Sequence, residues 1–179
     1  GAPLYLDIRD LFTDTMKDLL VDSPLRLLMP GFRVLERWAF RRAARINMVS
    51  EGFLDHIKSI APDVPHRLFT NGIDDEFLNF DFEFQSSSSE AKPLILYAGN
   101  LGEGQGLNKI LPEFSRLMQG EVRVRVIGDG GRRAELERAL LESGVTDVEV
   151  HPPVPRKELL SHYREADVLF LHLNDYDAF

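Results

Sequence analysis

Residues 94–107 read LILYAGNLGEGQGL. The first five of them, Leu94–Ala98, are apolar without alternation, which is typical of a strand buried on both faces of a parallel sheet. Four glycines fall among the next eight residues, Gly99–Gly106, and an amphipathic helix is predicted from Leu107 onward. A strand, a glycine loop and a helix in this order predict a βαβ unit, so we expect an α/β protein with parallel sheets.

The same alternation extends along the whole chain. Short apolar runs predict strands over Leu4–Ile8, Ile46–Val49, Arg67–Thr70, Leu94–Ala98, Val122–Ile127, Val148–Val150 and Val168–Leu173. Helical spacing predicts helices over Asp14–Leu20, Phe32–Arg45, Ser50–Ile60, Leu107–Met118, Arg132–Ser143 and Arg156–Ala166. Strands and helices therefore alternate in both halves of the chain, which predicts two α/β half-domains.

A linker is predicted near residues 79–92. This stretch contains four consecutive serines, Ser86–Ser89, whose side chains bury too little apolar surface to order a segment. The chain is accordingly divided into residues 1–78, the linker 79–92 and residues 93–179.

Composition and charge narrow the classes of function. The 21 Lys and Arg against 29 Asp and Glu give a net charge of −8, which disfavours nucleic-acid binding because phosphate neutralisation needs clustered cations. The absence of cysteine excludes disulfides and thiolate chemistry, and nothing demands an oxidising compartment. No apolar run reaches the roughly 18 residues of a spanning helix, and no signal peptide is apparent. We expect a cytoplasmic globular protein.

Two glycine loops are candidate phosphate sites, because each joins a predicted strand to a predicted helix. Gly99–Gly106 leaves backbone N–H groups unobstructed at a helix N-terminus, where amides and the helix dipole attract a phosphate; the alternative is a flexible turn. Gly128-Asp129-Gly130 permits a second tight turn. Behind it, Arg132 and Arg133 are either diphosphate contacts or solvated charges.

Two further loops follow predicted strands. Asn71-Gly72-Ile73-Asp74 is first of all a turn signal. Asp7-Ile8-Arg9-Asp10 places charged side chains at the end of a buried strand, which requires either an ion-pair network or a site. The five histidines lack metal-ligand spacing, so no metal site is predicted.

One basic segment departs from the acidic balance. Residues 24–45 hold six arginines against one glutamate. Four of these arginines recur every four residues and are predicted to form one stripe along a helix: Arg33, Arg37, Arg41 and Arg45. With apolar neighbours such as Trp38, the stripe is a candidate for peripheral contact with an anionic membrane face. The alternative is a solvated helix face that pairs with an acidic stripe of Asp14, Asp18 and Asp22.

Taken in chain order, these loops resemble the motifs of a known family, the retaining GT-B glycosyltransferases of family 4. The matching segments are Leu6–Leu11, Arg41–Ala43 with Val49–Phe53, Thr70–Asp74, Leu96–Gly102 with Gln105–Leu107, Val126–Gly130, Pro153–Pro155 and Ala166–Val168. The Asp-Ile-Arg-Asp and Gln-Gly-Leu variants are most similar to the bacterial surface-polysaccharide branch around the fucosaminyltransferase WbuB. The resemblance implies two Rossmann-like half-domains. It also implies transfer of a sugar, with retention, from a nucleotide diphosphate sugar to a saccharide or polyprenyl-linked acceptor.

The resemblance also assigns site residues. It implies that the donor phosphates lie against Gly99, Asn100, Leu101, Gly102, Gln105 and Gly106. The same cleft would be lined by Gly128, Asp129 and Gly130, with Arg132 and Arg133 behind them. The base would meet the backbone of Val154, Pro155, Arg156 and Lys157. On the acceptor side, Arg9 and Asp10 match a catalytic His-Asp pair, and neither a cofactor nor a metal is implied.

Departures from the family pattern bear on activity. Arg9 replaces the family's histidine, and Asn100 and Gln105 stand where many members carry an arginine and a lysine against the diphosphate. The chain starts after the opening βα unit of the acceptor domain and stops before the family's glutamate-containing segment. Both half-domains are therefore expected to be incomplete, and the 179-residue chain is expected to be inactive on its own. The alternative function is a non-catalytic nucleotide-sugar binding or scaffold module.

Overall fold

A computed structural model of the chain describes residues 2–20, 23–81 and 91–175. The chain divides into two compact units, of which the first runs to Ile73 and the second spans Asp74–Asn174, and each is described by itself. Most of the predicted linker, residues 82–90, lies outside the described residues. Within the described ranges, no helix is long and apolar enough to cross a membrane.

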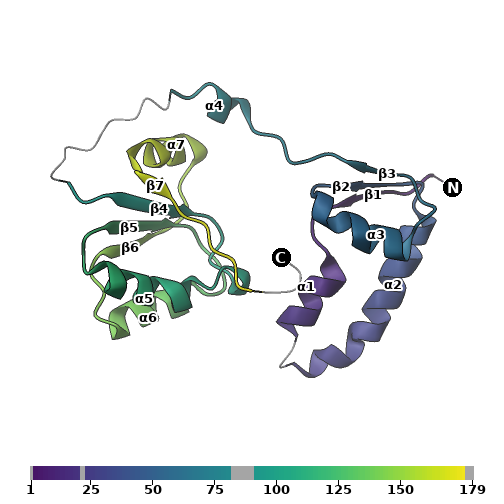
Figure 1. Ribbon diagram of the computed structural model, residues 1–179, viewed down its shortest axis with the longest axis horizontal. Helices are drawn as coiled ribbons and strands as arrows, with labels where there is room; N and C mark the ends of the chain where they lie inside the picture. The colour runs from purple at the N-terminus through teal and green to yellow at the C-terminus, as the bar shows by residue number, and fades with distance from the viewer. Residues whose placement is uncertain (1, 21–22, 82–90, 176–179) are drawn as a thin grey trace. The chain divides into compact units, whose positions relative to one another are not determined.

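The first unit is a parallel sheet with its helices on one side (Figure 1). Its strands, in spatial order, are β1 (Tyr5–Ile8), β2 (Arg45–Met48) and β3 (His66–Leu68). Its helices are α1 (Phe12–Leu19), α2 (Met29–Arg42) and α3 (Leu54–Ile60), with 3-10 turns over Pro24–Leu28 and Glu51–Phe53. Ile46 of β2 and Ile57 of α3 are fully buried, so the core lies between the sheet and these helices.

Helix α2 differs from the predicted helix Phe32–Arg45. It begins three residues earlier and ends at Arg42. The helix stops there because the backbone N–H of Ala44 donates to Leu4 O at 2.7 Å, which starts the parallel pairing of β2 with β1. Arg45 therefore belongs to β2, and the predicted four-arginine stripe is wrong at its last member.

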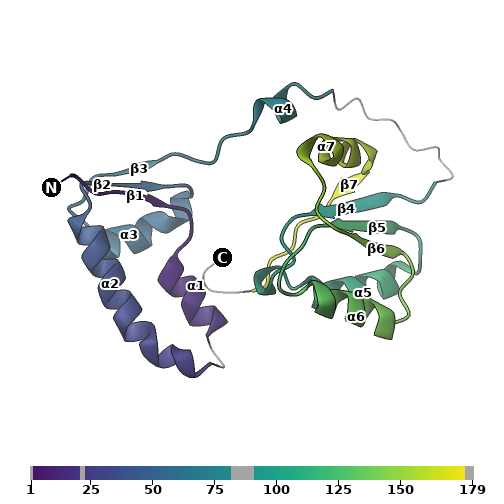
Figure 2. The same ribbon diagram turned by 180° about the vertical axis from the view of Figure 1, so that it is seen from behind.

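The second unit is a parallel sheet covered on both faces (Figures 1 and 2). Its strands, in spatial order, are β6 (Val148–His151), β5 (Arg123–Ile127), β4 (Leu94–Ala98) and β7 (Val168–Leu169). One face is covered by α5 (Leu107–Met118) and α6 (Arg133–Glu142), and the other by α7 (Arg156–Glu165). A short helix, α4 (Asp75–Leu78), precedes the sheet in the chain. The predicted α/β fold with parallel sheets is confirmed.

Two apolar layers hold the second sheet between its helices. On the side of α5 and α6, Leu111 and Leu136 pack with Val126 of β5, and each of the three is at most 1% exposed. On the side of α7, Leu96 and Ile127 pack with Ala166. Burial on both faces explains why these strands are continuous apolar runs in the sequence.

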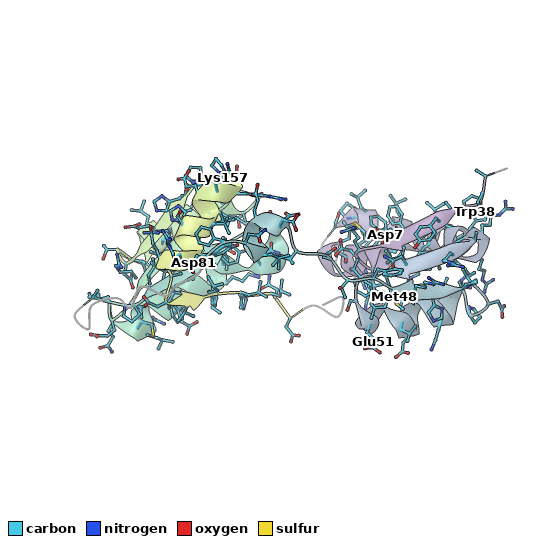
Figure 3. All side chains as sticks on the ribbon, turned by 90° about the horizontal axis from the view of Figure 1, so that it is seen from above. Asp7, Trp38, Met48, Glu51, Asp81 and Lys157 are labelled. Carbon is cyan, nitrogen blue, oxygen red and sulfur yellow. The ribbon has the colours of Figure 1, made fainter. Side chains whose placement is uncertain are left out.

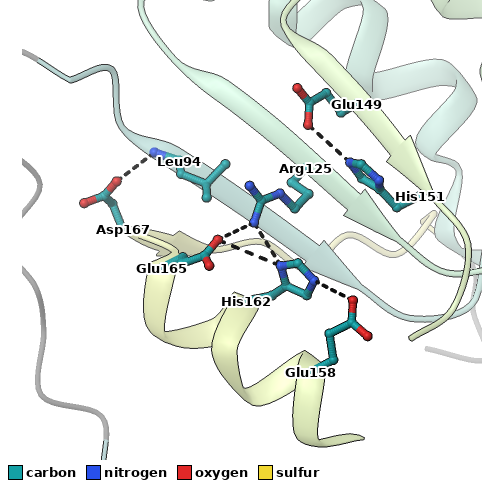
Figure 4. Close-up of polar contacts among 8 residues, drawn as sticks. All are labelled: Leu94, Arg125, Glu149, His151, Glu158, His162, Glu165 and Asp167. Carbon is teal, nitrogen blue, oxygen red and sulfur yellow. Dashed lines mark hydrogen bonds and ion pairs between the residues drawn. The ribbon is translucent and has the colours of Figure 1, made fainter. Parts of the chain in front are cut away.

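Polar contacts fix α7 on its face of the sheet (Figure 4). Arg125 of β5 donates to Nδ1 of His162 at 2.9 Å and to Oε2 of Glu165 at 2.7 Å, both on α7. Directly after α7, Asp167 accepts the backbone N–H of Leu94 at 2.7 Å. These bonds hold the C-terminal half of α7 and the start of β7 against the sheet.

Candidate functional site

The carboxyl ends of β4, β5 and β6 lie at one edge of the second sheet, because all its strands are parallel. The loops that follow these strands enclose a hollow of about 340 Å³. Its lining combines strand ends, both glycine loops and the segment entering α7: Ala98, Gly99, Asn100, Ile127, Gly128, Asp129, Pro153, Val154 and Leu159. Parallel sheets with helices on both faces bind ligands at this edge, so the hollow is the candidate site.

Backbone contacts hold the two glycine loops against each other. The N–H of Gly99 donates to Ile127 O at 3.0 Å, and the N–H of Leu101 donates to Asp129 O at 2.9 Å. A Cβ built on Gly128 would lie 1.9 Å from Gly99 O. Glycine is thus required at position 128, because the two backbones approach too closely for any side chain.

Side chains within the first loop fix its shape. Oε1 of Gln105 accepts from the N–H of Gly102 at 3.1 Å and from Nδ2 of Asn100 at 3.2 Å. The hydroxyl of Tyr97 donates to Asn100 O at 2.6 Å, and burial raises the pKa of this phenol. Gly106 closes the loop in the left-handed conformation, with a φ of 56°, immediately before α5. The loop is therefore a hydrogen-bonded turn at the N-terminus of α5.

A second anchor for this loop comes from the segment after β7. Nδ1 of His172 lies 2.7 Å from Gln105 O, and Nδ2 of Asn174 donates to Glu103 O at 2.6 Å. The N–H of Asn174 also donates to Gly104 O at 2.7 Å. His172 and Asn174 were not predictable as site residues, because no local pattern shows that the segment after β7 returns to the glycine loop.

The two arginines behind the second loop have different surroundings. Arg132 forms ion pairs with Glu135 and Glu103, and the hydrogen bond that it donates to Glu135 is the main cause that raises its pKa. Arg133 pairs with a carboxylate one turn further along α6 at 2.9 Å and donates from Nη1 to Gly128 O at 3.2 Å. Because Gly128 lines the hollow, Arg133 lies at its margin, whereas Arg132 is directed towards two carboxylates.

The segment leading into α7 contributes unequally to the hollow. Val154 lines it, whereas Pro155 precedes the first turn of α7. Arg156 pairs with Asp74, and Lys157 is exposed on α7 (Figure 3). The predicted donor residues that meet in the hollow are Gly99, Asn100, Gly128, Asp129 and Val154. Those that lie outside its lining are Leu101, Gly102, Gln105, Gly106, Gly130, Arg132, Arg133, Pro155, Arg156 and Lys157.

The carboxyl edge of the first sheet carries a network around Arg9. Asp7 accepts from Nδ2 of Asn47 at 2.5 Å and from Nε of Arg9 at 3.1 Å. The hydrogen bond from Asn47, followed by the charge of Arg9, lowers the pKa of Asp7. Nη1 of Arg9 also donates to Oδ1 of Asn71 at 2.7 Å, so the predicted Asn-Gly turn supplies a hydrogen-bond acceptor for this guanidinium. Asp10 lines a separate apolar pocket of about 190 Å³ between α1 and α2.

Among the described residues, no three His, Asp or Glu side chains converge to hold a metal ion. The polar groups that line the hollow are backbone, the amide of Asn100 and the carboxylate of Asp129, with the guanidinium of Arg133 at the margin. Its form is a parallel sheet covered on both faces, with glycine loops around a hollow at the carboxyl edge. This combination defines the class of Rossmann-like α/β proteins that bind ligands at that edge.

A family model described as Glycosyl transferases group 1 matches residues 79–179. Because this match covers more than half of the chain and coincides with the unit that holds the hollow, the chain belongs to this family.

Curated relatives carry glycosyltransferase names. The chain is 27% identical over 161 residues to 2-deoxystreptamine glucosyltransferase from Streptomyces kanamyceticus, a match that covers 82% of this chain and 41% of that protein. It is 34% identical over 61 residues to WcaI from Escherichia coli, named as a colanic acid biosynthesis glycosyl transferase; this match covers 34% of the chain and 15% of WcaI. The chain thus spans less than half the length of these relatives.

Solved structures share the fold at low sequence identity. Sucrose-phosphate synthase from Thermosynechococcus elongatus matches with a TM-score of 0.66 and 14% identity, covering 92% of this chain and 43% of that one. S. aureus TarM, solved in complex with UDP and other ligands, matches with a TM-score of 0.61 and 10% identity, covering 75% of this chain and 27% of that one. These likenesses confirm the GT-B type of fold, whereas membership of family 4 and the WbuB-like branch stay predictions.

Proposed function

We propose that the protein is a retaining glycosyltransferase. It moves a sugar from a nucleotide diphosphate sugar to a saccharide or polyprenyl-linked acceptor in the biosynthesis of a surface polysaccharide, in the cytoplasm. The observation that carries the proposal is the hollow at the carboxyl edge of the second sheet, where Gly99, Gly128 and Val154 line one space after the ends of three parallel strands. Membership of the group 1 family and the name of the relative WcaI, which refers to colanic acid, support it.

The donor occupies the hollow with its base against Val154 and its diphosphate against the glycine loops. The dipole of α5 stabilises the phosphates, because Asn100 and Gln105 are neutral and the N–H groups of Gly99, Leu101 and Gly102 already donate within the protein. Arg133 supplies the positive charge, since its Nη1 already lies 3.2 Å from Gly128 O, at the margin of the hollow. Arg132 is a poorer candidate because two carboxylates already pair with it.

On the acceptor side, Arg9 and Asp10 are the proposed catalytic residues. Asp7 and Asn71 hold the guanidinium of Arg9 at the carboxyl edge of the first sheet, and its side chain is 63% exposed. A held, exposed cation is suited to bind and orient an anionic group, and it does not act as a base because arginine stays protonated.

Donor binding tests the proposal directly. The 179-residue chain is titrated calorimetrically with UDP, GDP and dTDP and with their sugar conjugates, and saturable binding of one nucleotide is expected. Arg133→Gln is expected to weaken that binding about tenfold or more, since a hydrogen bond to a charged group contributes roughly 1.5–3 kcal/mol. Arg138→Gln is the matched control, because it removes the same charge from an exposed position on the same helix. Absence of binding to every nucleotide would overturn the proposal.

A transfer assay separates catalysis from binding alone. With donor and a polyprenyl-linked saccharide, we expect the 179-residue chain to bind without transferring. A longer protein, extended so that both half-domains are completed, is expected to transfer with retained anomeric configuration. The neutral Asn100 and Gln105 favour one second candidate, a non-catalytic nucleotide-sugar binding module. Donor binding without transfer by the longer protein would establish that candidate instead.

A further inference from the structure

Helix α2 has one face that the first unit leaves open. Met29 and Phe40 are buried against the core, whereas another side of the helix carries a shallow groove of about 570 Å³. Six of the residues that line the groove form a surface that we call the α2 basic face: Arg33, Val34, Arg37, Trp38, Arg41 and Arg42. Figure 3 places Trp38 at the margin of the unit, away from Asp7.

Part of the α2 basic face is held in place by contacts of its own. The guanidinium of Arg42 lies over the ring of Trp38, 5.1 Å from its centroid. Nε of Arg41 donates to Ile60 O at 3.0 Å. These contacts set an aromatic ring and two cations side by side on the surface without neutralising either charge.

The remaining charge of the face is also unneutralised. In the part of the chain that the structure describes, Arg33 and Arg37 have neither a hydrogen bond nor an ion pair. The one acid of α2, Glu36, faces another way and accepts from Oγ1 of Thr13 at 2.7 Å. Asp14, from the predicted acidic stripe, lies 3.4 Å from Nδ1 of a histidine on α3. Asp22 and the side chain of Asp18 lie outside the described residues.

Exposed apolar side chains lie among these cations. Val34 is 70% exposed and Trp38 is 55% exposed. Helices that lie at the boundary between lipid headgroups and acyl chains combine cations, which meet the headgroups, with apolar and aromatic side chains, which enter the acyl layer. Tryptophan favours that boundary because one end of its ring system is apolar and the other donates a hydrogen bond.

Other occupants fit the face less well. A second copy of the chain would bring four arginines against four arginines, and this repulsion opposes self-association. A nucleic acid would meet the cations but also the remainder of a chain whose net charge is −8. A flat layer of phosphate headgroups over an apolar interior matches both components of the face at once.

We propose that the α2 basic face docks the protein on an anionic lipid surface, with its arginines on headgroup phosphates and with Val34 and Trp38 in the interfacial layer. The site is distinct from the hollow of the second unit, and docking does not depend on the proposed transferase activity. Its failure and that of the proposed function are therefore separately measurable.

Trp38 is the single tryptophan of the chain, so its fluorescence reports on this face directly. The 179-residue chain is titrated with vesicles of phosphatidylcholine and with vesicles in which about a third of the lipid is phosphatidylglycerol. We expect a blue shift of the emission, and quenching by brominated acyl chains, with the anionic vesicles at low salt. Binding is expected to fall steeply as salt rises, because the attraction is electrostatic.

The double variant Arg33→Gln/Arg37→Gln tests the named residues. We expect its partition coefficient to fall about 30-fold, since each arginine near an anionic surface contributes about fivefold. Arg67→Gln/Arg138→Gln is the control, because both side chains are exposed, neither belongs to the α2 basic face, and the change in net charge is the same. Circular dichroism confirms that both variants are folded.

Three results would each overturn the proposal. They are absence of a spectral shift with anionic vesicles at low salt, equal binding to neutral vesicles, and equal losses in the two double variants. Sedimentation velocity without lipid is the complementary measurement. A dimer that Trp38→Ala abolishes, in a chain that does not bind vesicles, would assign the face to self-association instead.

Discussion

Gly128→Ala tests the packing of the two glycine loops. The new Cβ would lie 1.9 Å from Gly99 O, and real Cβ atoms essentially never approach closer than 3.0 Å, so the carbonyl has to retreat by about 1.1 Å. That shift lengthens the neighbouring hydrogen bond from Gly99 N–H to Ile127 O, now 3.0 Å. Overpacking costs roughly 1–3 kcal/mol and a lost hydrogen bond about 1 kcal/mol, so we expect about 2–4 kcal/mol of destabilisation.

The assay is calorimetric unfolding of the 179-residue chain, read on the transition of the second unit. For a unit of this size each kcal/mol lowers Tm by about 4–8 °C, so we expect a fall of about 8–32 °C. Gly131→Ala is the control in the same loop, because a Cβ there meets no atom within 4 Å. Equal Tm values for the two variants would refute the close approach, and with it the geometry of the hollow.

Three further predictions concern stability. Because the hydrogen bond from Asn47 lowers the pKa of Asp7, the contribution of Asp7 is present above about pH 4 and is lost as the pH falls further. The Tm difference between wild type and Asp7→Asn is therefore expected to shrink from pH 6 to pH 3 in scanning calorimetry, and a constant difference would contradict this. Tyr97→Phe is expected to cost about 1 kcal/mol at pH 7. Since burial raises the pKa of Tyr97, wild type should lose more stability than this variant above pH 10, as measured by urea unfolding at both pH values. Leu136→Ala, at a residue 1% exposed, is expected to cost about 2–5 kcal/mol by urea unfolding, whereas Leu141→Ala, at 81% exposure on the same helix, should stay within about 0.5 kcal/mol; similar values would contradict the assigned core.

The fold was predictable where local pattern and tertiary environment agree. Leu94–Ala98 forms the predicted strand to the residue, and the predicted apolar stripe from Leu107 to Met118 lies on α5, because burial on two faces or on one stripe produces a recognisable apolar pattern in the sequence. The end of α2 was not predictable in this way. The helical spacing of arginines continues to Arg45, but the competing hydrogen bond from Ala44 to Leu4 joins residues forty positions apart. Periodicity carries no information about such a bond.

The same distinction applies to the candidate site. Gly99 and Gly128 were predictable as lining residues, because each follows a strand and parallel strands end at a common edge, whereas Val154 was expected only from the family resemblance. The supports of the hollow, such as His172 against Gln105 O, join loops that are distant in the sequence, as Asn71 and Arg9 do within the first unit. Such contacts become visible only when the strand order is known, because β7 pairs with β4 and thereby returns the following segment to the first glycine loop. Loss of donor binding in a variant therefore has two structural causes to be separated: a changed lining residue or a changed supporting contact. A residue outside the hollow can shift the glycine loop as effectively as one within it.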